Sequence, residues 1–291
     1  MPEIHTTIAS FRAALDAARA GGRTVGFVPT MGYLHDGHAS LMRAAAAGND
    51  VAVASIFVNP LQFAAHEDLD DYPRDLDRDV AIADEAGVTH LLVPSVEEMY
   101  PRPLATAVAV SGLTERYEGA SRPEHFGGVA TVVTKLFAIA GPCRAYFGEK
   151  DFQQLAVVRR LAADLSFPVE VVGCPTGREP DGLARSSRNV YLDEAQRASA
   201  PVLHRALVAA ADAAAAGETS GAVLEAMVAD LVAAEPEGRL DYVALVDPDT
   251  LEPAATVGDG ARLLVAVFFG ATRLLDNIAV TPPSPAGTAS H

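Results

Sequence analysis

The chain has 291 residues, of which 49% are hydrophobic and 21% charged, and its formal net charge at pH 7 is -16. A chain of this size and composition can bury the core of one large or two moderate globular domains. The acidic balance disfavours a broad nucleic-acid-binding surface, because such surfaces need many basic residues to neutralise phosphates. It leaves room for a local basic pocket that binds one small anion.

The first residues and the cysteines lead us to expect a cytoplasmic protein. The opening MPEIHTTIASFRAAL lacks the basic start and apolar stretch of a signal peptide. No apolar run reaches the ~18 residues that a membrane span needs. Cys143 and Cys174 are far apart and match no metal-binding spacing, so we expect reduced thiols rather than a disulfide.

Helix-like and strand-like segments alternate over residues 7–173. We expect helices at 7–20, 37–47, 76–86, 126–141 and 151–165, and strands at 24–28, 51–58, 90–93, 145–148 and 169–173. These strands lack a clean polar alternation, which predicts a parallel sheet covered by helices on both faces. With right-handed crossovers, the pattern predicts a Rossmann-like, doubly wound α/β domain over residues 1–177.

The composition of the sequence changes near residue 193. Alanine-rich helices are expected at 194–217 and 221–236, followed by strands at 240–247 and 262–269. We predict a second, smaller α+β domain over residues 178–281, with the boundary in the polar loop 177–189. The final segment, 282–291, is rich in Pro, Ser and Gly and is predicted to be a disordered tail.

Polar, Gly- or Pro-rich segments follow four of the predicted strands. They are PTMGYLHDGH at 29–38, NPLQF at 59–63, FGEKDFQQ at 147–154 and PTGREPDGLARSSRN at 175–189. In an open α/β sheet, ligands bind beyond the carboxyl ends of the strands. The four segments therefore predict one composite site.

The two histidines of the first segment admit three interpretations. His35 and His38 would share a helix face and could hold zinc, but a metal needs further ligands, and Asp36 would point elsewhere. A helix beginning near Gly37 would offer backbone N–H groups and a positive dipole end to a phosphate, with the imidazoles as extra donors. The third interpretation is an ordinary surface loop. The spacing favours phosphate but leaves the other two open.

The other polar residues are individually weak signals. Lys150 could neutralise a polyphosphate, although an isolated Glu-Lys-Asp turn more often has Asp151 as a helix cap and a solvated lysine. Gln62 and Asn59 could bind a substrate hydroxyl or carboxylate, or could belong to a hydrogen-bonded turn. The acidic stretch 67–79 could be a solvated surface, a flexible lid or a magnesium ligand. The remaining histidines show no evident partner and are expected to be structural or exposed: His5, His66, His90, His204 and His291.

Six motifs in order resemble a known enzyme family. They are PTMGYLHDGH, SIFVNPLQF, YPRDLDRD, HFGGVATVVTKLF, FGEKDFQQL and DGLARSSRNVYL. Together they resemble the pantothenate synthetases, which are pantoate–β-alanine ligases. The match covers residues 24–192, with a weaker similarity in RLLVAVFFGATRLLDN. The resemblance implies the nucleotidyltransferase superfamily with its His-x-Gly-His signature, a Rossmann-like first domain, a smaller second domain and a homodimer.

The family's reaction has two steps. ATP and (R)-pantoate give pantoyl adenylate and pyrophosphate, and β-alanine then attacks the adenylate to give pantothenate and AMP. The implied cofactors are ATP, as a substrate, and Mg²⁺. The implied partners are these small molecules, without nucleic acid or membrane. No covalent enzyme intermediate is needed, so the lack of an evident nucleophile triad is no objection.

The resemblance also implies roles for individual residues. His35, His38 and Lys150 would be catalytic and contact the triphosphate, with His38 in the position usually given the proton-donor role. Gln62 and Gln154 would hold pantoate. Asn59 and Tyr72 would line the pocket, and the metal ligands are left open. The residues expected to bind ATP are Met31, Gly32, Tyr33, Leu34, His35, Asp36, Gly37, His38, Gly148, Glu149, Lys150, Asp151, Gly177, Arg185, Ser186, Ser187 and Arg188.

Some features leave the function open at this point. Arg185 and Gly177 stand where the family usually has apolar side chains, which puts nucleotide affinity in question. The segment 67–79 is the expected closing element that would shield the adenylate from water. The alternatives are another adenylyl- or cytidylyltransferase with the same histidine loop, and a regulatory protein that only binds a nucleotide.

Overall fold

The computed structural model describes residues 1–63, 69 and 72–283. Most of the predicted tail, as well as His66 and His291, therefore lies outside the described residues. The chain divides into two compact units, one ending at Thr176 and the next beginning at Gly177.

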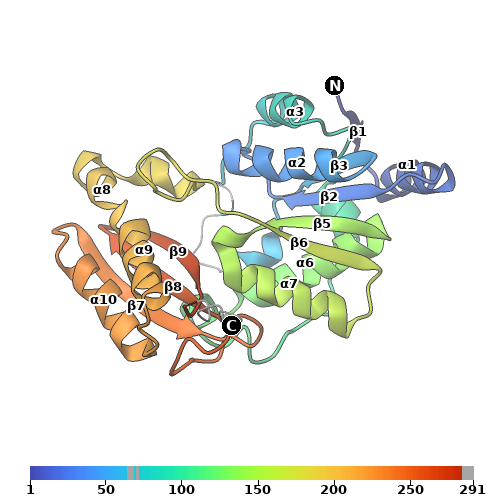
Figure 1. Cartoon of the computed structure of the whole chain (residues 1–291). Coiled ribbons are helices and arrows are strands. Elements are labelled where there is room, and N and C mark those ends of the chain that lie inside the picture. Colours follow the sequence, from blue (N-terminus) through green and yellow to red (C-terminus); the bar gives the residue numbers. More distant parts are fainter. Residues whose placement is uncertain (64–68, 70–71, 284–291) are drawn as a thin grey trace, which may run out of the picture. The chain divides into compact units, whose positions relative to one another are not determined.

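The first unit is built on a six-stranded sheet in the order β1-β4-β3-β2-β5-β6 (Figure 1). All neighbouring strands run parallel. The strands are β1 (Glu3–His5), β2 (Val25–Thr30), β3 (Val51–Ile56), β4 (His90–Leu92), β5 (Cys143–Gly148) and β6 (Val169–Cys174). The central strand β3 is buried from Val51 to Ser55, which explains why it lacks a polar alternation.

Helices cover both faces of this sheet. α2 (Asp36–Gly48) and α3 (Leu76–Glu85) pack on one face, and α1 (Ile8–Ala20), α6 (His125–Ala140) and α7 (Phe152–Asp164) pack on the other (Figure 1). Shorter helical segments lie in the connections: α4 (Val96–Met99), α5 (Glu118–Ser121), η1 (Pro60–Gln62) and η2 (Glu149–Asp151). The predicted doubly wound α/β architecture is confirmed.

The direction of winding reverses between β2 and β5. These two strands are neighbours in the sheet, but the helix after β2 lies on one face and the helix after β5 on the other. Such a switch point opens a crevice at the carboxyl ends of the two strands, where doubly wound sheets bind their ligands. The β2–α2 loop and the β5–α7 turn both begin there.

The second unit has a three-stranded antiparallel sheet in the order β7-β8-β9. The strands are β7 (Gly238–Val246), β8 (Ala261–Phe269) and β9 (Thr272–Val280), and the helical segments are η3 (Ser187–Tyr191), α8 (Glu194–Ser199), α9 (Val202–Ala215) and α10 (Gly221–Ala233). α9 and α10 pack on the sheet and share one apolar core with it. The predicted α+β character of this part is confirmed.

Three elements differ from the sequence-based expectation. The helix expected over 194–217 is two helices, because Pro201 lacks the backbone N–H that an uninterrupted helix needs. The short edge strand β1 and the strand β9 were not expected.

Cys143 and Cys174 are both free thiols. Among the residues that the structure describes, no helix combines the length and the apolar character needed to cross a bilayer.

Candidate active site

The loop between β2 and α2 is held by a buried carboxylate from α3. Asp79, which is 1% exposed, accepts the backbone N–H of Tyr33 at 2.8 Å and of Leu34 at 2.6 Å. Burial raises the pKa of Asp79, although these two hydrogen bonds oppose the rise. The loop contains left-handed residues at Gly32 (φ 84°) and Tyr33 (φ 50°). At Gly32 a Cβ would also lie 3.0 Å from the Asp79 carboxylate, so this position requires glycine.

The two histidines form the amino-terminal cap of α2. His35 is the N-cap residue, and its Nδ1 accepts the backbone N–H of Gly37 at 3.1 Å. His38 is at the third helical position, and its Nδ1 accepts the backbone N–H of His35 at 3.4 Å. This is the reciprocal arrangement of a capping box. Because Nδ1 is the acceptor in both rings, the neutral form of each carries its proton on Nε2 as a hydrogen-bond donor.

This geometry argues against the zinc interpretation of the pair. His35 lies outside the helix in extended backbone (φ -140°, ψ 175°), so the two rings do not share a helix face as a zinc pair would. The rings instead lie against each other, with centroids 4.1 Å apart. Within the described part of the chain, no third metal-ligating side chain joins them to complete a cluster.

His38 is uncharged at neutral pH. Burial, together with the neighbouring His35, lowers the pKa of His38 to about 3, and the Asp151 carboxylate opposes this shift. The electrostatic effect of Asp151 on His38 also shows that the β5–α7 turn lies near the histidine cap. The structure therefore brings two of the predicted polar segments together at the switch point.

Lys150 does not behave as the lysine of an isolated helix cap. Its side chain is 15% exposed, and its Nζ lies 3.4 Å from Asp151 Oδ1. Asp151 is the N-cap residue of α7 but makes no side-chain capping hydrogen bond. The interpretation of a capping Asp151 beside a solvated Lys150 is thus wrong.

The turn after β3 places Gln62 against the β2–α2 loop. Gln62 is 9% exposed, and its Nε2 donates to Met31 Sδ at 2.8 Å. The hydrogen-bonding groups of Asn59 are used within the protein: Nδ2 donates to Gln62 Oε1 and to the Gly128 carbonyl, each at 3.2 Å. Asn59 Oδ1 accepts the Tyr100 hydroxyl at 2.8 Å. Asn59 therefore positions Gln62, as expected for a hydrogen-bonded turn.

The adjacent glutamines at the start of α7 have different surroundings. Gln153 is buried. Its Nε2 donates to the carbonyls of Leu113 and Arg116, and its Oε1 accepts the backbone N–H of Glu118. Gln154 is half-buried, and its side chain makes no hydrogen bond within the described residues. Gln154 is thus the glutamine with amide groups to offer a ligand.

The closing role expected for the segment 67–79 stays a prediction. Residues 67, 68, 70 and 71 of the segment 67–79 lie outside the described residues, and residues 76–79 form the first turn of α3. The ring of Tyr72 contacts that of Phe63, with centroids 5.8 Å apart. Asp79 was grouped with the lid in the sequence, but the structure shows a buried residue that supports the β2–α2 loop.

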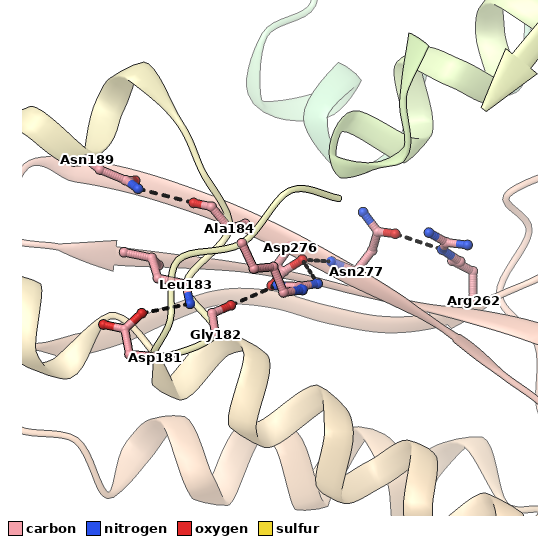
Figure 2. Close-up of polar contacts among 9 residues, drawn as sticks. Asp181, Gly182, Leu183, Ala184, Asn189, Arg262, Asp276 and Asn277 are labelled. Carbon is pink, nitrogen blue, oxygen red and sulfur yellow. Dashed lines mark hydrogen bonds and ion pairs between the residues drawn. The ribbon is translucent and has the colours of Figure 1, made fainter. Parts of the chain in front are cut away.

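The loop 177–189 of the second unit is shaped by an ion pair whose carboxylate, from Asp276, is buried (Figure 2). Arg178 donates to both carboxylate oxygens of Asp276, at 2.6 and 3.0 Å, and to the Gly182 carbonyl at 3.0 Å. Asn189 donates to the Ala184 carbonyl at 3.1 Å (Figure 2). No local pattern indicated the pair between Arg178 and Asp276, which are 98 positions apart.

The candidate ATP-binding residues of this loop have local contacts. The N–H of Arg185 donates to the Gly177 carbonyl at 2.9 Å, and its Nε donates to the Arg178 carbonyl at 3.2 Å. Ser186 accepts the N–H of Arg188 at 3.2 Å and so caps η3, whereas Ser187 and Arg188 are exposed. Their contact with a nucleotide stays a prediction.

A sequence model of one enzyme family covers nearly the whole chain. The model described as pantoate-beta-alanine ligase matches residues 3–279. The chain belongs to the pantoate–β-alanine ligase family.

Relatives within this family are similar over their full length. A pantothenate synthetase from Sinorhizobium medicae is 56% identical over 280 residues, which cover 96% of each chain. One from Thermus thermophilus is 56% identical over 280 residues, covering 95% of this chain and 99% of the relative.

Solved structures of pantoate–β-alanine ligases share the fold. The crystal structure of the Thermus thermophilus pantothenate synthetase matches with a TM-score of 0.90 at 54% identity, covering 96% of this chain and 100% of that one. A Francisella tularensis pantoate-beta-alanine ligase, described as complexed with beta-gamma ATP and beta-alanine, matches with a TM-score of 0.76 at 31% identity. The coverage is 96% of this chain and 97% of that chain.

Most of the residues predicted for the site lie in the first unit of this ligase family member. The contacts described above connect Met31 with Gln62, His35 with His38, and Lys150 with Asp151. The role of Asp79 was missed, because nothing in an acidic run of sequence distinguishes a carboxylate that the fold buries.

Proposed function

We propose that the protein joins (R)-pantoate to β-alanine with the consumption of ATP, with pantoyl adenylate as the intermediate. In the first step a pantoate carboxylate oxygen attacks the α-phosphorus of ATP, the bond to the bridging oxygen breaks, and pyrophosphate leaves. In the second step the β-alanine amine attacks the acyl carbon, AMP leaves, and the nitrogen loses a proton. Membership of the ligase family supports this reaction.

The histidine cap of α2 is the observation that carries the site assignment. Two Nε2–H donors and the amino end of a 13-residue helix lie at the switch point of the sheet, and Asp151, the neighbour of Lys150 in the chain, acts electrostatically on His38. The pyrophosphate leaving group gains negative charge as its bond to the α-phosphorus breaks, and fixed donors aimed at such charge lower the barrier. We assign His35, His38 and Lys150 to the triphosphate. Since the pKa of His38 is about 3 in the free protein, its ring would meet the triphosphate as a neutral hydrogen-bond donor rather than as an acid.

The remaining residues of the first unit fit substrate binding. Gln62, fixed by Asn59 and Met31, and Gln154 are proposed to hold pantoate. The backbone of the β2–α2 loop and the turn from Gly148 to Asp151 are proposed to hold ATP. For Gly177 and the residues from Arg185 to Arg188 the nucleotide role rests on the family resemblance alone.

Magnesium is proposed to enter with ATP. Mg²⁺ keeps several waters and takes one or two carboxylates together with substrate phosphates. The Asp151 carboxylate, 51% exposed and beside Lys150, is an oxygen donor of this kind, so the residues present fit the ion. When bound, Mg²⁺ would supply neutralisation of the phosphate charge.

The physiological form is proposed to be a cytoplasmic homodimer, as the family resemblance implies. Light scattering of the purified protein measures its mass directly. A monomer at all accessible concentrations would contradict the dimer.

AMP formation from ATP and magnesium tests the function. We expect AMP only when both pantoate and β-alanine are present, and pyrophosphate release when pantoate is present alone. Another nucleotidyltransferase would release pyrophosphate independently of pantoate, and a regulatory protein would release none. Lys150→Ala is expected to lower turnover by orders of magnitude while the protein stays folded. A near-native rate for this variant would remove Lys150 from the mechanism.

A further inference from the structure

A second group of histidines lies on the edge strands β1 and β4 of the first unit, apart from the proposed ATP site. The two strands pair in parallel with Glu3 opposite His90 and His5 opposite Leu92. Side chains alternate along a strand, so Glu3 and His5, two residues apart, project to the same face as His90. His90 is the first residue of β4 and Glu3 the first residue of β1, whereas the proposed ATP site follows the carboxyl ends of β2 and β5. The sequence showed no partner for His5 or His90, whereas in the structure the two rings contact each other and Glu3.

The donor atoms of these three side chains converge. His5 Nε2 lies 3.1 Å from His90 Nδ1. The Glu3 carboxylate places Oε1 at 3.8 Å from His5 Nε2 and Oε2 at 3.5 Å from His90 Nδ1. One ligand atom from each residue lies within 4.8 Å of the other two. A tetrahedral zinc ion with bonds of about 2.0–2.2 Å holds its ligand atoms roughly 3.3–3.6 Å apart, so small adjustments of the side chains would close the site.

His5 is oriented as a metal ligand would be. Its Nδ1 lies 3.3 Å from Ser10 Oγ, and that hydroxyl donates its single proton to the Thr7 carbonyl at 3.0 Å. Ser10 Oγ is therefore the acceptor for His5 Nδ1–H, which leaves the lone pair of His5 on Nε2, directed at His90 and Glu3. The ring is 3% exposed and packs against Phe11, with ring centroids 5.7 Å apart. Metal-binding histidines are commonly fixed by such a hydrogen bond from the second ring nitrogen.

We propose that Glu3, His5 and His90 bind one zinc ion, or a divalent ion of similar preference, with water at the fourth position. Two imidazoles and one carboxylate are a donor set that zinc accepts in proteins. The side chain of Glu3 is 67% exposed and that of His90 19% exposed, so the ion can enter from solvent. Bound there, the ion joins the three-residue edge strand β1 to β4, which lies 85 positions away along the chain. The site is independent of the proposed ligase chemistry.

Metal titration of the full-length protein tests the proposal. The protein is stripped with a chelator and titrated with Zn²⁺, followed by calorimetry, and with Co²⁺, followed by its visible absorption, both without ATP. We expect one tight ion per chain and the intense bands of four-coordinate Co²⁺. Ser10→Ala, which removes the partner that orients His5, should weaken zinc binding about 10- to 100-fold. His90→Gln, which removes a ligand, should weaken it further.

Two further variants keep the result interpretable. Glu3→Gln changes one exposed atom and preserves the fold, and it too should weaken zinc binding and reduce the Co²⁺ bands. The double variant His35→Gln/His38→Gln removes the other histidine pair and should keep the tight ion. The proposal is overturned if Glu3→Gln and His90→Gln bind zinc as the unaltered protein does, or if only the double variant loses the ion.

Discussion

Gly128 lies near the start of α6, directly against the backbone of η1, and replacing it with alanine is expected to displace Gln62. A Cβ at this position would lie 2.2 Å from the Leu61 carbonyl oxygen and 2.6 Å from Gln62 Cα. Real Cβ contacts stay beyond 3.0 Å, so the backbone must move by at least 0.8 Å. Overpacking of this kind costs about 1–3 kcal/mol, against the roughly 0.5–1 kcal/mol that alanine gains over glycine in a helix. A misplacement near 1 Å can lower a rate about 100-fold.

The neighbouring glycine provides a matched control. A Cβ at Gly127 meets no atom within 4 Å, so Gly127→Ala should raise the free energy of unfolding by about 0.5–1 kcal/mol and leave AMP formation unchanged. Gly128→Ala should lower kcat/KM for pantoate about 10- to 100-fold while urea unfolding still shows one cooperative transition. If Gly128→Ala matches Gly127→Ala in both assays, the contact between α6 and η1 does not position Gln62.

Two further substitutions separate residues that look alike in the sequence. Asp79→Asn should lower kcat/KM for ATP and destabilise the protein by about 1–3 kcal/mol, because an amide nitrogen would face one of the two backbone N–H groups. The control is Asp77→Asn, which makes the same charge change at an exposed position of α3. This control should change neither kcat/KM for ATP nor stability. Equal activities of the two variants would refute the support of the β2–α2 loop by Asp79. Gln153→Ala leaves two backbone carbonyls and one backbone N–H without their side-chain partner and should reduce the free energy of unfolding. Gln154→Ala should instead reduce activity with pantoate and leave the free energy of unfolding unchanged. The opposite pattern in urea unfolding and AMP assays would reverse these roles.

The architecture of the first unit could be predicted because its signals are local. Apolar strands and amphipathic helices alternate along the chain, and the pattern alone indicates a parallel sheet with two covered faces. The edge strand β1 has three residues, too few to show a period. It exists because β4, which is distant in the sequence, offers it a hydrogen-bonding edge. β9 was missed although it is as long as β8, and its charged residues Arg273 and Asp276 obscured the strand.

The candidate site was less predictable than the fold, because its geometry depends on contacts between distant segments. The histidine motif indicated a phosphate site, but the use of both Nδ1 atoms in one helix cap is visible only in three dimensions. Likewise, the local sequence around Lys150 favoured a solvated lysine, and the fold buries most of its side chain beside Asp151. A carboxylate such as Asp79 is selected from an acidic run by the burial of one helix face, which depends on what packs against α3.

The neutrality of His38 has a measurable consequence for stability. Its pKa is about 3 in the folded protein and 6.5 ordinarily. Between these two pH values the unfolded chain binds a proton on His38 that the folded chain does not bind. The contribution of His38 to stability is therefore fully present above pH 6.5 and is lost as the pH falls toward 3, by at most ~1.4 kcal/mol per pH unit. This slope is an upper limit, because the side chain is only half-buried. His38→Asn keeps an acceptor for the His35 N–H and cannot titrate, so its unfolding free energy should fall less steeply between pH 6.5 and 4.5. Parallel curves for the two proteins in urea would mean that the fold does not lower the pKa of His38, and the neutral form of its ring would then not be a consequence of its burial.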